Sequence, residues 1–211
     1  MKLTKYDHAC FVLEKAGQQL LIDPGNFTDN FELSENLVAV VITHLHPDHC
    51  DTRKLAQSRE NYPEIPFFAH KSVASEYQKL KFETVEPGDI KQVGSFTLEF
   101  NGGEHATIHP DIPPIANLGV TVDDMLYYPG DSFTPPPKQM QIIAVPVAAP
   151  WLKISMAMDF IAETRPTYAF PTHDAILSDK GRQLADRLLG ISAAQVNTTY
   201  ERIASGETVE F

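Results

Sequence analysis

The sequence predicts an α/β fold in which mixed β-sheets and helices lie in layers. Apolar runs of strand length recur between turn signals such as Asp23-Pro24-Gly25, and residues 38–42 are apolar throughout, as in a strand buried on both faces. Nine mainly apolar runs are predicted as strands: 11–13, 20–22, 38–42, 67–69, 96–100, 118–122, 125–128, 142–145 and 168–170. Short turns join the early strands, whereas helical patterns separate several later ones. This succession is typical of layered α/β domains, and we expect residues 1–211 to form a single domain.

Helical patterns and long loops fill the intervals between strands. The helices are expected at about residues 51–59, 71–80, 155–164 and 179–189. Ser178 is a suitable N-cap for the last helix, and Gly190 is the expected stop. The proline-rich stretches 108–114 and 133–137 predict ordered loops.

The composition restricts the partners that the chain can bind. A formal charge of −11 disfavours a nucleic-acid backbone or an anionic membrane, because either would be repelled. No apolar stretch approaches the roughly 20 residues that span a bilayer, and the first residues lack the apolar core of a signal peptide. Two cysteines do not make a disulfide framework. We therefore expect a cytoplasmic protein with reduced thiols that acts on a small molecule; the oligomeric state stays open.

The stretch at residues 41–51, VITHLHPDHCD, concentrates metal-binding side chains. It holds three of the chain's eight histidines and an aspartate within six positions. Pro47 prevents a helix from running through the cluster, and in an extended segment His44 and His46 point to the same side. Asp48 and His49 follow where the chain turns towards a helix. Since divalent metals accept imidazole and carboxylate together, this loop offers two pairs of ligands for two neighbouring ions.

One loop cannot complete two metal sites, so further ligands are expected from other strand ends at the same edge of the sheet. Suitable segments follow three predicted strands: 101–105, 129–132 and 171–174. Site one would take His44, His46 and His105, and site two would take Asp48, His49 and His173, with Asp131 bridging both. His109 is the alternative to His105. We favour His105 because it directly follows the strand and its glycines.

Together these motifs resemble those of the metallo-β-lactamase-fold metallohydrolases. The family's five motifs match Asp23, the histidine cluster, His105, Asp131 and His173, in the family's order. The segments 6–11 and 171–174 are similar to the branch that contains ascorbate-6-phosphate lactonase and N-acylphosphatidylethanolamine phospholipase D. The resemblance implies a four-layer αββα sandwich of two mixed β-sheets, with a dinuclear site at one edge.

The predicted function is metal-dependent hydrolysis of an ester, lactone or phosphodiester-type bond in a small substrate, either uncharged or anionic. Hydroxide bridging two metal ions would attack the bond, and Asp48 would orient this nucleophile. Zinc is the expected metal, with manganese or iron as alternatives. Two other functions stay open: a non-catalytic metal-binding or ligand-sensing module, and a di-iron redox protein. His46 disfavours the redox function, because the flavodiiron oxygen reductases have glutamate at this position.

Several further residues are expected to support the site. Asp23, at a strand end, is the best candidate to orient a ligand imidazole, although it also suits a simple turn. The resemblance places His8 near the site, where a hydrogen-bonded core histidine is the alternative. Asp174 would hold His173 or cap the following turn. Trp151 and Lys153 would stack on and pair with an anionic substrate; ordinary packing and a solvated lysine are the alternatives.

Overall fold

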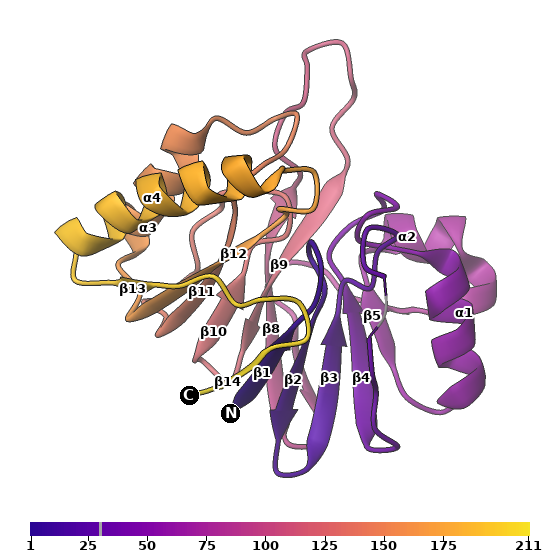
Figure 1. The fold of residues 1–211 in the computed structure, drawn as a ribbon. Helices are drawn as coiled ribbons and strands as arrows, with labels where there is room; N and C mark the ends of the chain where they lie inside the picture. Colours follow the sequence, from indigo (N-terminus) through magenta and orange to yellow (C-terminus); the bar gives the residue numbers. More distant parts are fainter. Residues whose placement is uncertain (30) are drawn as a thin grey trace.

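The computed structural model describes residues 1–29 and 31–211, which form two seven-stranded sheets packed face to face (Figure 1). The first sheet has the order β14-β1-β2-β3-β4-β5-β6, and the second has the order β13-β12-β11-β10-β9-β8-β7. Helices cover the outer face of each sheet. The predicted αββα sandwich of two mixed sheets is confirmed.

The first sheet comprises β1 (Lys2–Lys5), β2 (Phe11–Lys15), β3 (Gln18–Ile22), β4 (Leu37–Ile42), β5 (Phe67–Ala69), β6 (Glu83–Thr84) and β14 (Thr208–Glu210). The second comprises β7 (Ile90–Val93), β8 (Phe96–Glu104), β9 (Ala116–Val122), β10 (Leu126–Tyr128), β11 (Ile142–Pro146), β12 (Tyr168–Thr172) and β13 (Thr199–Tyr200). The helices are α1 (Thr52–Asn61), α2 (Lys71–Glu76), the 3₁₀ turn η1 (Gln78–Leu80), α3 (Ile154–Thr164) and α4 (Asp179–Gln195).

Both sheets are half antiparallel and half parallel. In the first, pairing is antiparallel from β14 to β3 and parallel from β3 to β6. In the second, it is antiparallel from β7 to β10 and parallel from β10 to β13. A parallel connection requires a crossover, so α1 and α2 lie between parallel strands of the first sheet, and α3 and α4 between those of the second.

Three apolar clusters hold these layers together, because successive side chains of a strand point to opposite faces. In β2, Phe11 and Leu13 enter the cluster between the two sheets, whereas Val12 enters the cluster beneath α1 and α2. A third cluster lies between the second sheet and α3 and α4, where Phe160 and Leu189 are buried.

The predicted helix ends differ from the observed ones. Ser178 caps α4 as expected, accepting a hydrogen bond from the amide of Gly181, but the helix continues through Gly190 to Gln195. The helix continues because its buried stripe extends past the glycine: Ser192 is buried, and its hydroxyl donates to the Met158 carbonyl of α3 at 2.6 Å. The helix expected at 71–80 divides into α2 and η1.

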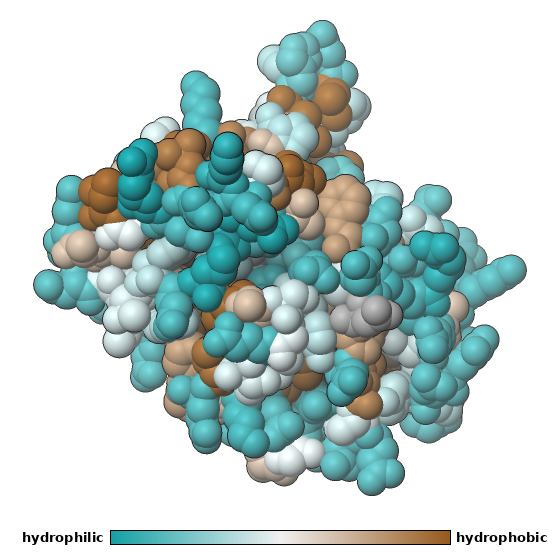
Figure 2. Space-filling view, viewed as in Figure 1, coloured by the Kyte–Doolittle hydropathy of each residue, from teal (hydrophilic) through white to brown (hydrophobic). Residues whose placement is uncertain are grey.

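The loops after several strands gather at one edge of the sandwich, and the loop between β8 and β9 projects beyond it (Figure 1). The opposite edge brings the termini together, where the Phe211 amide donates to the Met1 carbonyl at 2.8 Å. The face in this view is largely hydrophilic, with apolar areas around α4 and on the projecting loop (Figure 2). Within the described residues, no helix has the length and apolar character required to cross a membrane.

Candidate metal centre

Eight metal-ligand-type side chains converge at the edge where the loops gather. They form two groups, and within each group one ligand atom per residue lies within 4.8 Å of the others. The first group is His44, His46, His105 and Asp131, and the second is His8, Asp48, His49 and His173. All seven side chains predicted as metal ligands are therefore brought together, and His8 joins them.

The strand order produces this convergence. The loop at residues 43–50, called the histidine loop below, follows β4; His105 and His173 come directly after β8 and β12; and Asp131 follows β10. The two sheets meet here through an isolated bridge between His44 and Asn117 of β9. Residues from both sheets thus share one buried space.

The alternative ligand His109 lies elsewhere. It is exposed on the projecting loop, where its imidazole is 3.6 Å from the Asp111 carboxylate. His105 is buried, with its ring centroid 5.0 Å from that of His44 and 4.7 Å from that of His46. The geometry favours His105 as the third imidazole of the first group.

Asp131 contacts imidazoles of both groups. Its Oδ1 lies 3.1 Å from Nε2 of His49, and its Oδ2 lies 3.3 Å from Nε2 of His105 and 3.0 Å from Nε2 of His173. A carboxylate so placed can contribute an oxygen to each of two neighbouring sites, as the bridging position requires.

Four imidazoles direct Nε2 towards this space, because their Nδ1 atoms are hydrogen-bonded elsewhere. The Nδ1 atoms of His49, His105 and His173 lie 2.7, 2.6 and 2.5 Å from the Asp23 carboxylate, the Ala106 carbonyl and the Ala148 carbonyl, respectively. Such oxygens only accept, so each Nδ1 carries a hydrogen, and in the neutral ring Nε2 keeps a lone pair that a metal can take. In His44, Nδ1 lies 3.0 Å from the Thr43 hydroxyl, which itself donates to Asp23, and the same tautomer follows.

The residues fit a divalent metal because several buried atoms here lack a hydrogen-bond partner. Within the described chain, these atoms include Nε2 of His49, His105 and His173 and Oδ1 of Asp131. Each such buried atom costs about 1–3 kcal/mol, so four of them in one space require compensation. A cation supplies it, and imidazole with carboxylate is a donor set that borderline divalent ions accept.

Charge at the centre leads to the same conclusion. Burial by itself would lower the pKa of His173, but the neighbouring carboxylates of Asp131 and Asp48 raise it to about 9. Burial would raise the pKa of Asp131, but the imidazoles around it hold it well below its usual range. Without metal, protons balance these carboxylates, and metal binding would displace the protons.

Most of the chain matches a known protein family. The family model described as "Beta-lactamase superfamily domain" matches residues 2–173. The chain belongs to the metallo-β-lactamase superfamily. Protein Rv0786c of Mycobacterium tuberculosis is 37% identical over 187 residues, covering 86% of this chain and 88% of that protein.

Further relatives agree with this membership. The UPF0173 metal-dependent hydrolase of Carboxydothermus hydrogenoformans is 26% identical over 221 residues, covering 93% of this chain and 97% of its own. Among solved structures, Igni18, a metallo hydrolase of the archaeon Ignicoccus hospitalis, aligns with a TM-score of 0.73 at 20% identity, covering 100% and 98% of the two chains. This likeness shows a shared fold.

His8 positions Asp48 and is not free to bind metal itself. Its Nδ1 accepts a hydrogen bond from the Ala175 amide at 3.3 Å, so its hydrogen lies on Nε2, which donates to Oδ2 of Asp48 at 3.1 Å. Burial lowers the pKa of His8 to about 4, which keeps the ring neutral near pH 7. Both ring nitrogens are therefore occupied.

Asp23 lies beneath the histidine loop and orients His49. It is fully buried, and its carboxylate also accepts hydrogen bonds from the Thr43 amide, the Thr43 hydroxyl and the Tyr128 hydroxyl, at 2.8, 2.6 and 3.0 Å. Asp23 was predicted from the sequence, whereas Thr43 and Tyr128 were not. Neither has a local signal, although both adjoin a predicted ligand segment.

Trp151 and Asn117 fix Asp131 from two sides. The Trp151 indole donates to Oδ2 of Asp131 at 3.1 Å and is only 8% exposed, so it belongs to the centre and does not present a face to substrate. The Asn117 side chain accepts from the Asp131 amide at 2.9 Å and donates to the Pro129 carbonyl at 2.8 Å. Asn117 was also missed, because a lone asparagine in a strand has no distinguishing pattern.

Two predicted supporting residues have other roles. Asp174 does not hold the His173 ring, whose Nδ1 donates to the Ala148 carbonyl; it forms an ion pair with Arg202 instead. The cause is the left-handed backbone of His173, with φ of 60°, which turns the chain between the two side chains. Lys153 is exposed at the start of α3 and lines no cavity found beside the centre.

A tight turn supports the histidine loop from below. The Asn26 amide donates to the Pro47 carbonyl at 2.8 Å, and the chain passes so close that a Cβ atom on Gly25 would lie 1.6 Å from the Asp48 carbonyl oxygen. Only glycine permits this approach, so Gly25 helps to set the position of Asp48.

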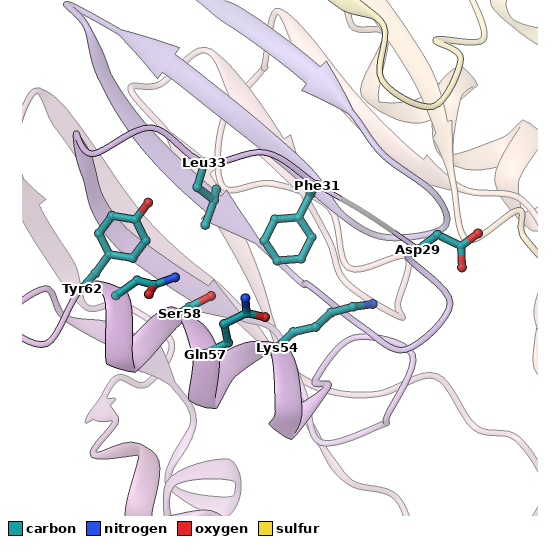
Figure 3. Close-up of a pocket in the computed structure, with 8 residues that line it drawn as sticks. Asp29, Phe31, Leu33, Lys54, Gln57, Ser58 and Tyr62 are labelled. Atoms are coloured by element: carbon teal, nitrogen blue, oxygen red, sulfur yellow. The ribbon is translucent and has the colours of Figure 1, made fainter.

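Two cavities differ in their relation to the centre. One, of about 420 Å³, is lined in part by His46, Asp48 and His173. The other, of about 280 Å³, lies beside α1 and contains none of the clustered histidines (Figure 3). There the Lys54 ammonium donates to the carbonyls of Gly25 and Thr28, so its hydrogens serve the turn and not a ligand.

Proposed function

We propose that this metal-dependent hydrolase of the metallo-β-lactamase superfamily holds two divalent ions and hydrolyses an ester, lactone or phosphodiester-type bond. The first ion would be held by His44, His46 and His105, the second by Asp48, His49 and His173, and Asp131 would bridge them. Zinc is the expected ion, with manganese or iron as alternatives. The substrate would be a small molecule, because the cavity at the centre is of that size.

The observation that carries the proposal is the set of unpartnered atoms within reach of both groups. Three imidazole Nε2 atoms and one oxygen of Asp131 are buried without hydrogen bonds, although a structural zinc site needs only four ligands in total. Seven candidate ligands exceed that need. The surplus of ligands, together with a cavity that reaches Asp48 and His173, supports two metal ions that are accessible to substrate.

Two bound ions would lower the pKa of a bound water and would supply positive charge beside the oxygens of the scissile group. The chain's own residues then position the reactants. Asp48 is 19% exposed in its side chain and lines the cavity, so it can accept a hydrogen bond from the attacking water and orient it. Burial would raise the pKa of Asp48, but the nearby His173 imidazole and the hydrogen bond from His8 hold it well below its usual range. Asp48 is therefore a carboxylate at neutral pH.

The reaction balances without a further reactant. The water oxygen bonds to the carbonyl carbon or to phosphorus, the bond to the leaving oxygen breaks, and the two protons of water end on the new acid group and the new hydroxyl group. Asp131 would be held throughout by the Trp151 indole and the Asn117 side chain. These contacts keep the Asp131 carboxylate in place between the two groups of imidazoles.

The test is metal removal and reconstitution. The purified chain is treated with a chelator, reloaded with Zn²⁺ or Mn²⁺, measured for bound metal, and assayed on esters, lactones, phosphodiesters and thioesters. We expect two ions per chain, loss of activity on chelation and its return on reloading. His44→Ala should lose metal and activity together, whereas the exposed His109→Ala should keep both.

Other outcomes would identify the alternative functions. Activity that ignores metal removal would refute the proposed mechanism. Two bound ions without turnover of any substrate would indicate a sensing module. Bound iron with oxygen consumption would indicate a redox protein.

A further inference from the structure

The 420 Å³ cavity beside the centre has apolar walls away from the metal ligands. Its volume lies in the range of about 300–1,000 Å³ that is usual for small-molecule sites. His46, Asp48 and His173 form part of the wall, so a molecule bound here contacts the proposed reaction centre. The apolar part of the wall is formed by Phe27, Pro47, Pro150 and Ile176.

Two of these apolar side chains are unusually exposed for their size. Phe27 is 44% exposed and Ile176 is 51% exposed, although burying such a side chain is worth about 1.5–3 kcal/mol. They come from different loops, after β3 and after β12, and face the same cavity. Exposed apolar residues that converge on a pocket are typical of surfaces that a ligand covers.

Phe27 is held in place at this wall. Its ring packs edge-on against the His8 ring, with centroids 5.0 Å apart and an interplanar angle of 73°. His8 in turn donates to Asp48, so the apolar wall is fixed relative to the carboxylate that orients the attacking water. A chain lying against Phe27 would therefore have a defined position relative to the scissile bond.

Within the described residues, the cavity has no lysine or arginine to pair with an anionic substituent, and Asn26 is the polar residue in its lining besides His46, Asp48 and His173. Lys153 lies outside this cavity. Bound ions would attract the scissile group itself, but a second anionic group further out would meet apolar side chains. The net charge of −11 on the chain would oppose it further.

We propose that this cavity binds an uncharged, apolar substituent of the substrate, such as an aliphatic acyl chain, and that Phe27 and Ile176 determine this specificity. The inference rests on the proposed function, because it assumes that the bond cleaved lies beside Asp48 and His173. It favours carboxylic esters or lactones of apolar acids over substrates with a second charged group, and so replaces the anionic substrate expected from the sequence.

Binding is tested separately from turnover. The chain contains one tryptophan, Trp151, which follows Pro150 of the cavity wall, so its fluorescence can report ligand binding. The zinc-loaded full chain is titrated with 1-alkanols of increasing length. We expect the dissociation constant to fall about fourfold per added methylene, the value for a fully buried CH₂. Ile176→Ser should reduce the fall in dissociation constant per methylene to less than about twofold, and Phe27→Ala should also make it smaller.

Ile191→Ser is the matched control, because Ile191 is 50% exposed on α4 and lies outside the cavity lining. It should keep the full dependence on chain length. Since Ile176 is exposed, its substitution should leave the fold intact. A dissociation constant that does not vary with alkanol length would overturn the inference.

Turnover is tested with a matched pair of esters. The 4-nitrophenyl ester of hexanoic acid and the mono-4-nitrophenyl ester of adipic acid differ only in a terminal carboxylate. We expect kcat/KM for the hexanoate to be at least about tenfold higher, and the preference to shrink in Ile176→Ser. Hydrolysis with the adipate preferred would overturn the apolar-substrate inference and leave the proposed hydrolysis standing. Length-dependent alkanol binding without hydrolysis of any ester would support the apolar cavity and count against the proposed hydrolysis.

Discussion

Replacing Asp23 by asparagine removes one charge from the buried support of the histidine loop and changes almost nothing in shape. The Asp23 carboxylate is 0% exposed. Its Oδ2 accepts from the hydroxyls of Thr43 and Tyr128 and from Nδ1 of His49, while Oδ1 accepts from the Thr43 amide. All four partners act as donors towards an acceptor-only group. An asparagine amide cannot satisfy all of them.

The magnitude follows from this arrangement. If the amide nitrogen takes the Oδ1 position, it faces the Thr43 amide; if it takes the Oδ2 position, it faces three donors. At least one donor is left buried without an acceptor, which costs about 1–3 kcal/mol, and the remaining hydrogen bonds lose their charge assistance. We expect Asp23→Asn to lower the free energy of unfolding by about 2–4 kcal/mol. Zinc affinity should fall about 10–100-fold, because His49 loses the group that orients it.

Urea unfolding of the metal-free chain measures the first effect, and competition with a chromophoric chelator measures the second. Asp111→Asn is the control: its side chain is 90% exposed on the projecting loop, so both quantities should stay within about 0.5 kcal/mol of the original. An Asp23→Asn variant that binds zinc within threefold of the unchanged chain would show that Asp23 does not orient His49.

Three further predictions follow from other contacts. Gly25→Ala should destabilise the chain by at least about 3 kcal/mol in urea unfolding, because its Cβ would lie 1.6 Å from a backbone oxygen of the histidine loop. As the control, Gly190→Ala in α4 has nothing within 4 Å of the added Cβ and should stabilise the chain by about 0.5–1 kcal/mol. Equal effects of the two substitutions would contradict this reasoning. Trp151→Phe should keep the ring packing but lose the hydrogen bond to Asp131, and zinc affinity should fall about tenfold by chelator competition; unchanged affinity would mean that the bond does not position the carboxylate. Burial lowers the pKa of Lys5 from 10.5 to about 8. Between these two pH values Lys5 is protonated in the unfolded chain and neutral in the folded chain. The free energy of unfolding therefore rises with pH, by up to about 1.4 kcal/mol per pH unit. Urea unfolding should show this rise, relative to Lys5→Met, between about pH 8 and about pH 10, and an equal pH dependence in both chains would argue against it.

Much of the fold could be predicted because its signals are local. The double-sided apolar run at 38–42, the strand lengths and the serine cap before residue 179 each depend on a few neighbouring residues. The end of α4 could not be read in this way. Gly190 is a local stop signal, but the burial of Ser192 against α3 extends the helix, and that contact depends on tertiary packing.

For the site, the sequence by itself determined which residue types stand at the strand ends, and hence which side chains could bind a metal. The ligand chemistry of imidazole and carboxylate belongs to each residue wherever the fold places it. Only the tertiary structure decided that His105 joins the cluster and His109 does not, and that His8 donates to Asp48. It also supplied the Tyr128 hydrogen bond to Asp23, which joins residues 105 positions apart. Such contacts depend on how the two sheets pack against each other, and no short stretch of sequence determines that packing.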